Sequence, residues 1–202
     1  MTTLLDSRLV APRFTLAEAH RAGDEWGLNC GPAAIATMTR LSLDELRPHL
    51  GDFEQKHYTN PTLMWSILKS IGVFWAICKD GRKWPKYGLV RVQWEGPWTA
   101  PGVPMVARYR HTHWVGAMYL ADGEEQMVFD INCLEAMGGW VPLAMWESSV
   151  VPHILKYCEP KANGLWHPTH VVEVTRASIA ASIPSIAVLR RSLLTLRSFK
   201  TH

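Results

Sequence analysis

A change of residue pattern near Gly72 constrains the fold of this chain more than any other feature of its sequence. On the N-terminal side of Gly72 the chain carries helix signals: Thr15 caps a predicted helix over residues 15–22, and a capping box opens at Ser42. A third helix is predicted to begin at Pro61 and to end at Gly72. The first third of the chain is therefore predicted to be mainly helical.

Beyond Gly72 the sequence has the composition of short strands. Asp122 and Gly123 lie between two of them and are typical of a hairpin turn. Helices followed by antiparallel strands predict an α+β fold. The predicted strands cover residues 73–80, 89–94, 103–110, 113–121, 126–132 and 169–176, and the first two are expected to be joined by the basic turn over 81–88.

Composition and charge exclude several classes of protein. The chain has 202 residues, of which 48% are hydrophobic and 19% charged, as expected for one folded domain over residues 1–176 with a basic, apolar tail over 177–202. A net charge of +3 does not indicate a nucleic-acid partner, and no apolar stretch reaches the length of a membrane span. The four cysteines are widely spaced and no secretory signal precedes them, so we expect free thiols and a cytoplasmic location.

The stretch "EWGLNCGPAAIATM" over residues 25–38 points to chemistry. A loop here is predicted to lead into a buried helix that begins at about Cys30. The unpaired N–H groups and the dipole of a helix N-terminus stabilise a thiolate. Cys30 is therefore a candidate nucleophile, although a buried cysteine at a helix start is more often structural.

His113 and Asp130 are the candidate partners of Cys30. His113 begins one predicted strand and Asp130 ends the next, so a hairpin between them would bring the two side chains together. The carboxylate would hold the imidazole in one tautomer, and the imidazole would take the thiol proton and later protonate a leaving group. His111 is an alternative base, and Asn132 is an alternative partner for the imidazole.

Two blocks of the sequence resemble papain-fold cysteine peptidases: "NCGPAAIATMTRLSLDEL" and "HWVGAMYLADGEEQMVFDIN". They are most similar to the bacteriocin-processing (double-glycine leader) peptidase domains and their stand-alone bacterial and phage relatives. The resemblance covers roughly residues 15–135. It implies a papain-like fold in which the central helix carries Cys30 as nucleophile and packs on an antiparallel sheet, with His113 as base and Asp130 as orienter.

The sequence departs from that family at the oxyanion hole. Papain-fold enzymes usually carry a glutamine about six residues before the nucleophile, and here Asp24 stands at that position with Glu25 beside it. A carboxylate would repel a developing oxyanion. The Asn29 side chain and the backbone N–H of Cys30 are the candidate donors, and Trp26 is a candidate wall of the substrate cleft.

The resulting expectation is a thiol hydrolase that cleaves a peptide or amide bond through an acyl-enzyme on Cys30, with transfer to an amine as a variant of the same chemistry. The alternative is a catalytically weakened papain-fold binding protein of phage or bacterial origin that uses a cleft rich in tryptophan. A peptide or protein is the expected ligand, and no cofactor or metal is expected. A zinc site is a less favoured interpretation. Its ligands would be His111 and His113 with Cys133 or Cys158, or His167 with His170.

Overall fold

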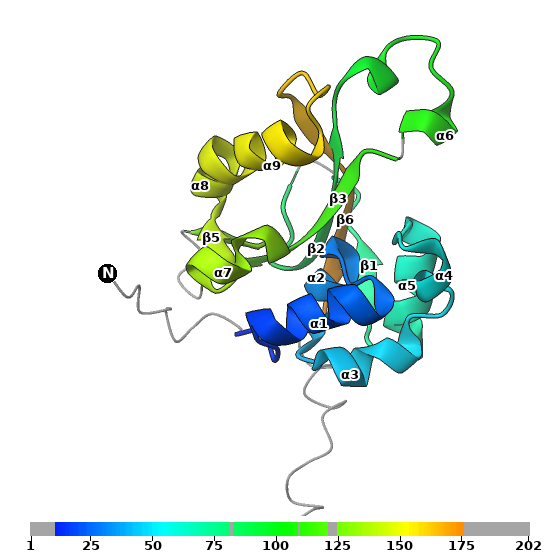
Figure 1. The fold of residues 1–202 in the computed structure, drawn as a ribbon, viewed down its shortest axis with the longest axis vertical. Helices are drawn as coiled ribbons and strands as arrows, with labels where there is room; N and C mark the ends of the chain where they lie inside the picture. Colours follow the sequence, from blue (N-terminus) through cyan, green and yellow to red (C-terminus); the bar gives the residue numbers. More distant parts are fainter. Residues whose placement is uncertain (1–10, 81–82, 109, 121–124, 176–202) are drawn as a thin grey trace, which may run out of the picture.

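The computed structural model describes residues 11–80, 83–108, 110–120 and 125–175, and it has the predicted α+β organisation. Helices come first and the strands follow, as Figure 1 shows in the passage from blue to green. The N-terminal helices are α1 (Leu16–Trp26), α2 (Cys30–Thr39), α3 (Leu43–Leu46), α4 (Phe53–Lys56) and α5 (Pro61–Ser70), with a 3₁₀ turn, η1 (Arg47–His49), between α3 and α4.

The strands form one six-stranded antiparallel sheet in the order β1-β6-β2-β3-β4-β5. The predicted hairpin of β3 and β4 is present, with Gly116 opposite Phe129. The last predicted strand is also present, as β6, which lies between the edge strand β1 and β2. The bounds are β1 (Trp75–Ile77), β2 (Tyr87–Trp94), β3 (Thr112–Tyr119), β4 (Gln126–Phe129), β5 (Trp140–Pro142) and β6 (Trp166–Val174).

Each face of the sheet carries its own hydrophobic core. The N-terminal helices cover one face, and the C-terminal helices α8 and α9 cover the other (Figure 1). Alternate residues of a strand point to opposite faces, so Leu89 belongs to the first core and Val90 to the second. The remaining elements are η2 (Pro97–Thr99), α6 (Met105–Arg108), η3 (Ile131–Cys133), α7 (Leu134–Met137), α8 (Leu143–Met145), the π-helical turn η4 (Trp146–Val150) and α9 (Val151–Cys158).

Helix α2 is the central helix of the first core. Every residue from Gly31 to Thr39 is buried, and the helix packs on β3 and β2. Its small side chains permit this close approach. At Gly116 of β3, a Cβ atom would lie 2.8 Å from the sulfur of Met38, so only glycine fits there without displacement. The sheet thereby fixes where the N-terminus of α2, and with it Cys30, must lie.

Three local predictions differ from the structure. The loop expected before Cys30 is shorter, because α1 continues to Trp26 and ends where Gly27 adopts a left-handed conformation with φ of 76°. The strand expected over 103–110 is instead the short helix α6, which begins directly after Pro104. Met105 and Val106 are 65% and 71% exposed, so no sheet buries their side chains.

The expected hairpin between the first two strands is also wrong. β1 and β2 do not pair, because β6 lies between them and pairs with both. A long-range strand can displace a local pairing when it buries more apolar surface, and Val171 and Val172 of β6 are fully or almost fully buried. The predicted tail over 177–202 and the turn residues Asp122 and Gly123 lie outside the described residues.

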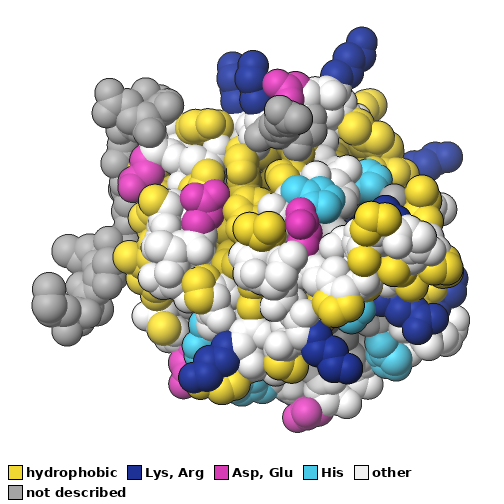
Figure 2. Space-filling view, turned by 90° about the horizontal axis from the view of Figure 1, so that it is seen from above, with side chains coloured by type: hydrophobic (Ala, Val, Ile, Leu, Met, Phe, Trp, Pro, Cys, Tyr) yellow, Lys and Arg dark blue, Asp and Glu magenta, His cyan; other side chains and the backbone are white. Residues whose placement is uncertain are grey.

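Charges of both signs are distributed over the face of the molecule shown in Figure 2. Lys and Arg side chains lie mostly toward the edges of this face, and Asp and Glu side chains lie both at its edges and nearer its centre. This distribution agrees with the small net charge of +3. Among the described residues, no helix is long and apolar enough to cross a membrane.

Candidate active site

Cys30 is the first residue of α2, as the sequence predicts. Asn29 caps the helix, and its side-chain oxygen accepts a hydrogen bond from the N–H of Gly31 at 3.2 Å. Pro32, the third residue of the helix, has no N–H. Because the N–H of Gly31 is bonded to the Asn29 cap, the N–H of Cys30 is the remaining backbone donor among the first three helical residues. The N–H of Trp114 on β3 donates to the Cys30 sulfur at 3.5 Å. The thiol therefore lies where backbone donors from two elements favour its anionic form.

His113 connects Cys30 to a buried carboxylate. Its Nε2 lies 2.9 Å from Oδ2 of Asp130, and its imidazole is also hydrogen-bonded to the Cys30 side chain. Because Nε2 faces Asp130, the bond to Cys30 uses Nδ1. The structure brings together the three residues predicted as nucleophile, base and orienter, from the start of α2, the start of β3 and the end of β4.

Asp130 is fully buried, and both of its carboxylate oxygens have donors. Oδ2 accepts from His113 and from the indole N–H of Trp146 at 2.8 Å. Oδ1 accepts from the backbone N–H and the side-chain amide of Asn132, at 3.0 and 2.9 Å. The partner of His113 is thus Asp130, and Asn132 binds Asp130. Asp130 and Asn132 do not share a face of a strand, because β4 ends at Phe129 and Asp130 caps the turn η3.

The electrostatics of the three groups favour a thiolate beside an imidazolium. Burial raises the pKa of Cys30, but the charge and hydrogen bond of His113 and the Trp114 N–H outweigh it, and the pKa is lowered. Burial lowers the pKa of His113, but the Asp130 carboxylate and the Cys30 thiolate raise it well above its usual value. Burial likewise raises the pKa of Asp130, and the charge of His113 with the donors around it holds that pKa below its usual value.

The partly buried thiol of Cys78 and the buried thiol of Cys133 have the opposite tendency. Burial raises the pKa of Cys78, and burial together with the neighbouring Asp130 charge raises the pKa of Cys133 to about 12. Only a thiolate is a strong nucleophile, so we expect these two cysteines to react slowly. Cys158 is exposed on the surface.

His111, the alternative base, takes part in a different contact. Its Nδ1 lies 2.8 Å from Oε2 of Glu159, and its ring stacks on Trp98 with 3.6 Å between centroids. His113 instead stacks on Trp94, at 5.8 Å. Of the two histidines it is therefore His113 that contacts the Cys30 thiol.

The acidic residues expected near the oxyanion belong to helix α1. Asp24 is exposed, and the Glu25 carboxylate pairs with Arg21 and Arg47 at 3.8 and 3.6 Å. Asn29, by contrast, lies beside Cys30, and its amide nitrogen donates to the carbonyl of His57 at 2.9 Å. A primary amide has two N–H bonds, so this contact orients Asn29 and uses one of them.

A cleft of about 680 Å³ opens beside Cys30. One wall is Trp114, whose indole N–H donates to the carbonyl of Thr59 at 2.7 Å. Trp26, the predicted wall, is not part of the lining: it is 4% exposed and packs edge-on against Phe53 in the core. The lining residues are Asn29, Cys30, His57, Tyr58, Thr59, Asn60, Arg91, Val106, Arg110, Thr112 and Trp114.

Most tryptophans fill the core and do not line this cleft. Trp94, Trp140 and Trp146 are each at most 3% exposed, and Trp84 and Trp166 pack edge-on against Trp146. Trp114 is the tryptophan in the cleft lining. The tryptophan-rich recognition surface of the alternative prediction is therefore not seen beside Cys30 in the described residues.

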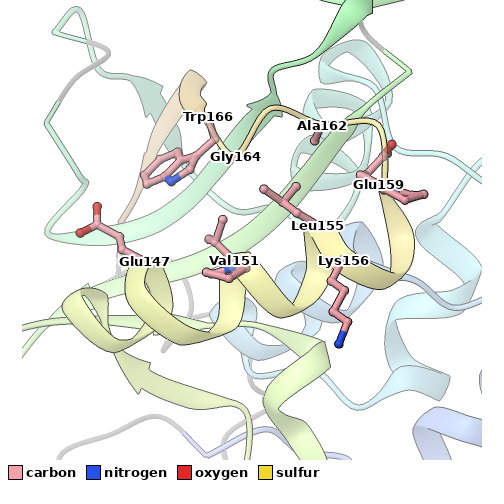
Figure 3. Close-up of a pocket in the computed structure, with 10 residues that line it drawn as sticks. Glu147, Val151, Leu155, Lys156, Glu159, Ala162, Gly164 and Trp166 are labelled. Atoms are coloured by element: carbon pink, nitrogen blue, oxygen red, sulfur yellow. The ribbon is translucent and has the colours of Figure 1, made fainter.

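A second pocket lies between α9 and the start of β6 (Figure 3). Val151 and Leu155 point from the helix toward the strand that carries Trp166, whereas Lys156 points away. Neither a cysteine nor a histidine is among its lining residues. Within the part of the chain that the structure describes, no group of three or more His, Cys, Asp or Glu side chains could hold a metal ion.

Sequence reasoning missed three parts of the site: the donor Trp146, the wall over residues 57–60, and Arg91. Trp146 follows Asp130 by 16 residues and meets it only because α8 and η4 fold back over the sheet. Arg91 lies inside a strand of otherwise apolar character. The sequence signal for Arg91 was its charge within the run "LVRVQW". A charged side chain in a central strand is costly unless it has partners.

Comparison of the sequence with protein-family models finds no match, and comparison with curated proteins finds none either. The assignment of a function to this site therefore rests on its geometry and chemistry.

Proposed function

We propose that this protein is a papain-like thiol hydrolase that cleaves a peptide or amide bond through an acyl-enzyme on Cys30. The observation that carries the proposal is the connected set of Cys30, His113 and Asp130 at the edge of a 680 Å³ cleft. A structural cysteine would not need a buried imidazole that is itself held by a buried carboxylate. The α+β order, with the nucleophile on a central helix, agrees with the papain-like resemblance.

In the first half of the reaction, the Cys30 thiolate attacks the carbonyl carbon of the scissile amide. The carbonyl π electrons move to its oxygen, which the Cys30 N–H and the free N–H of the Asn29 amide stabilise. The imidazolium of His113 then gives its Nδ1 proton to the leaving nitrogen. The C–N bond breaks, the amine leaves, and the acyl group remains on Cys30 as a thioester.

In the second half, neutral His113 takes a proton from water as the water oxygen attacks the thioester carbon. The C–S bond breaks, the acid leaves, and the thiolate and imidazolium are restored. Asp130 stays ionised throughout and keeps the Nε2 proton on His113. If an amine replaced water as the second nucleophile, the product would be a new amide and no residue would change its role.

The experiment is incubation of the full chain with a degenerate peptide library, followed by mass spectrometry of products and of the acid-quenched protein. We expect new peptide ends and an acyl adduct on the Cys30 peptide. Cys30→Ala should abolish both, and His113→Ala should reduce turnover by roughly a hundredfold or more. Cys158→Ala, which removes an exposed thiol away from the site, is the matched control and should keep wild-type turnover. Turnover that survives Cys30→Ala would contradict the proposal.

A further inference from the structure

The cleft beside Cys30 is positively charged. Arg91 and Arg110 both line it, and no Asp or Glu is among its lining residues. Arg110 is exposed, whereas Arg91 is 3% exposed. The cleft thus combines one buried and one surface guanidinium within reach of the same cavity.

The sheet register explains why Arg91 faces this cleft. Arg91 lies directly opposite Trp114 in the β2–β3 pair, and opposite residues of an antiparallel pair point to the same face. Trp114 belongs to the core on the α2 side, so Arg91 points to the side on which Cys30 lies. His113, one residue earlier, is opposite Val92 and points to the other face.

Hydrogen bonds to the two neighbouring strands hold the Arg91 side chain in place. Its guanidinium donates to the hydroxyls of Thr112 and Thr169, at 3.1 and 3.4 Å. His170 lies opposite it on β6, and burial together with the Arg91 charge lowers the pKa of that imidazole. His170 is therefore driven toward its neutral form and adds no second positive charge next to Arg91.

We propose that the cleft selects peptide substrates with a carboxylate close to the scissile bond, which Arg91 and Arg110 bind. Guanidinium groups bind carboxylates through strong, charge-assisted hydrogen bonds, and a partly buried site strengthens them. The carboxylate can come from an Asp or Glu side chain or from the C-terminus of the substrate. This inference rests on the proposed function, because it describes what the cleft beside the nucleophile accepts.

The peptide test uses pairs that differ only by Glu against Gln at each position around the cleaved bond, and pairs that end in a free carboxylate or an amide. The first set reports a side-chain carboxylate and the second a terminal one. We expect kcat/KM to favour the acidic member of at least one pair by roughly tenfold. Arg91→Gln and Arg110→Gln should each reduce that preference. Equal rates within every pair would overturn the inference.

A second test does not need peptide cleavage. The alkylation rate of Cys30 is measured with anionic iodoacetate and neutral iodoacetamide, and the ratio of the two rates is compared between variants. Arg110→Gln alters an exposed residue and should lower the ratio by roughly threefold, as expected when one unit charge is removed from the cleft lining in a water-like medium. Arg91→Gln should lower it at least as much. Lys156→Gln, which removes a charge on α9, should leave it unchanged.

The two proposals fail in different ways in this test. If Cys30 reacts with iodoacetamide no faster than Cys158, the thiol hydrolase is contradicted, whatever the ratio. If Cys30 reacts fast but its ratio is the same in the wild type, Arg91→Gln and Arg110→Gln, the carboxylate site is contradicted and the hydrolase stands.

Discussion

At the scale of single residues, the site depends on Asp130, a fully buried carboxylate whose ionised form must be stabilised by its neighbours. Its four hydrogen bonds come from His113, Trp146 and Asn132. An uncompensated buried charge is costly, so these donors are what allows Asp130 to remain ionised and to raise the pKa of His113. In the proposed mechanism Trp146 would act through Asp130, to which it donates a hydrogen bond, and would be a positioning residue.

Replacement of Trp146 by Phe should therefore affect both stability and the reactivity of Cys30. Trp146→Phe removes the indole N–H bonded to Asp130 Oδ2 and keeps an aromatic ring. We expect the free energy of unfolding to fall by about 1–3 kcal/mol. The pKa of Cys30 should rise, because a less stable Asp130 carboxylate supports His113 less. Urea titration and the pH profile of Cys30 alkylation measure the two effects.

Trp84→Phe is the matched control, because Trp84 packs on Trp146, whereas the donors to Asp130 are His113, Asn132 and Trp146. It should leave the pH profile of Cys30 unchanged. A Trp146→Phe protein whose profile equals that of the wild type would show that the hydrogen bond to Asp130 does not position the site.

At the scale of elements, the N-terminus of α2 is fixed by close contacts that leave no room for larger side chains. A Cβ on Gly31 would lie 2.3 Å from the hydroxyl of Thr59 and 2.6 Å from its Cβ. Thr59 in turn accepts the Trp114 indole bond through its carbonyl. The chain that forms the cleft wall is thus packed directly against the turn that carries Cys30.

Gly31→Ala should destabilise the protein although alanine favours helices. The clash with Thr59 must displace either the helix start or the cleft wall, at a cost of about 1–3 kcal/mol. Gly23→Ala in α1 is the matched control, since a Cβ there meets nothing within 4 Å. It should stabilise the protein by about 0.5–1 kcal/mol. Thermal unfolding of the two variants tests this, and equal effects would contradict the packing account.

The sequence predicted some of these elements and their pairing, but not all of them. Caps and periodicity predicted α1, α2, α3 and α5, because those signals act within a few residues. The hairpin of β3 and β4 followed from a local turn, and it placed His113 near Asp130. The position of β6 between β1 and β2 did not follow, because long-range pairing depends on which buried faces match. For the same reason, the sequence did not predict that Trp146 and the cleft wall over 57–60 would lie at the site.

At the scale of the whole molecule, the site lies where the two cores meet across the sheet. Cys30 packs with the helices of the first core, whereas His113 stacks on Trp94 of the second. The two residues can meet because each lies at the end of its element, beside the start of β3. Asp130, which is hydrogen-bonded to both His113 and Trp146, therefore links the stability of the fold to the proposed catalytic site.

This coupling predicts a specific pH dependence of stability. The pKa of Asp130 is lower in the folded than in the unfolded protein, so its contribution is complete above its unfolded pKa of about 3.9 and is lost as the pH falls through its folded value. Asp130→Asn should cost roughly 3 kcal/mol near pH 6. The difference from the wild type should shrink below about pH 4, as urea titrations at a series of pH values can measure. A difference that is independent of pH would show that Asp130 is not ionised in the folded protein.

The central claim is that Cys30 and His113 form a thiolate–imidazolium pair, and the rate of iodoacetamide alkylation at each cysteine across pH tests it most directly. The lowered pKa of Cys30 predicts that its alkylation rate falls off at a lower pH than the rate of an ordinary thiol. An ordinary thiol, with a pKa of about 8.5, slows about tenfold for each pH unit below that value. His113→Ala should move the Cys30 profile to higher pH. A Cys30 profile that follows that of an ordinary thiol, or one that His113→Ala leaves unchanged, would contradict the account.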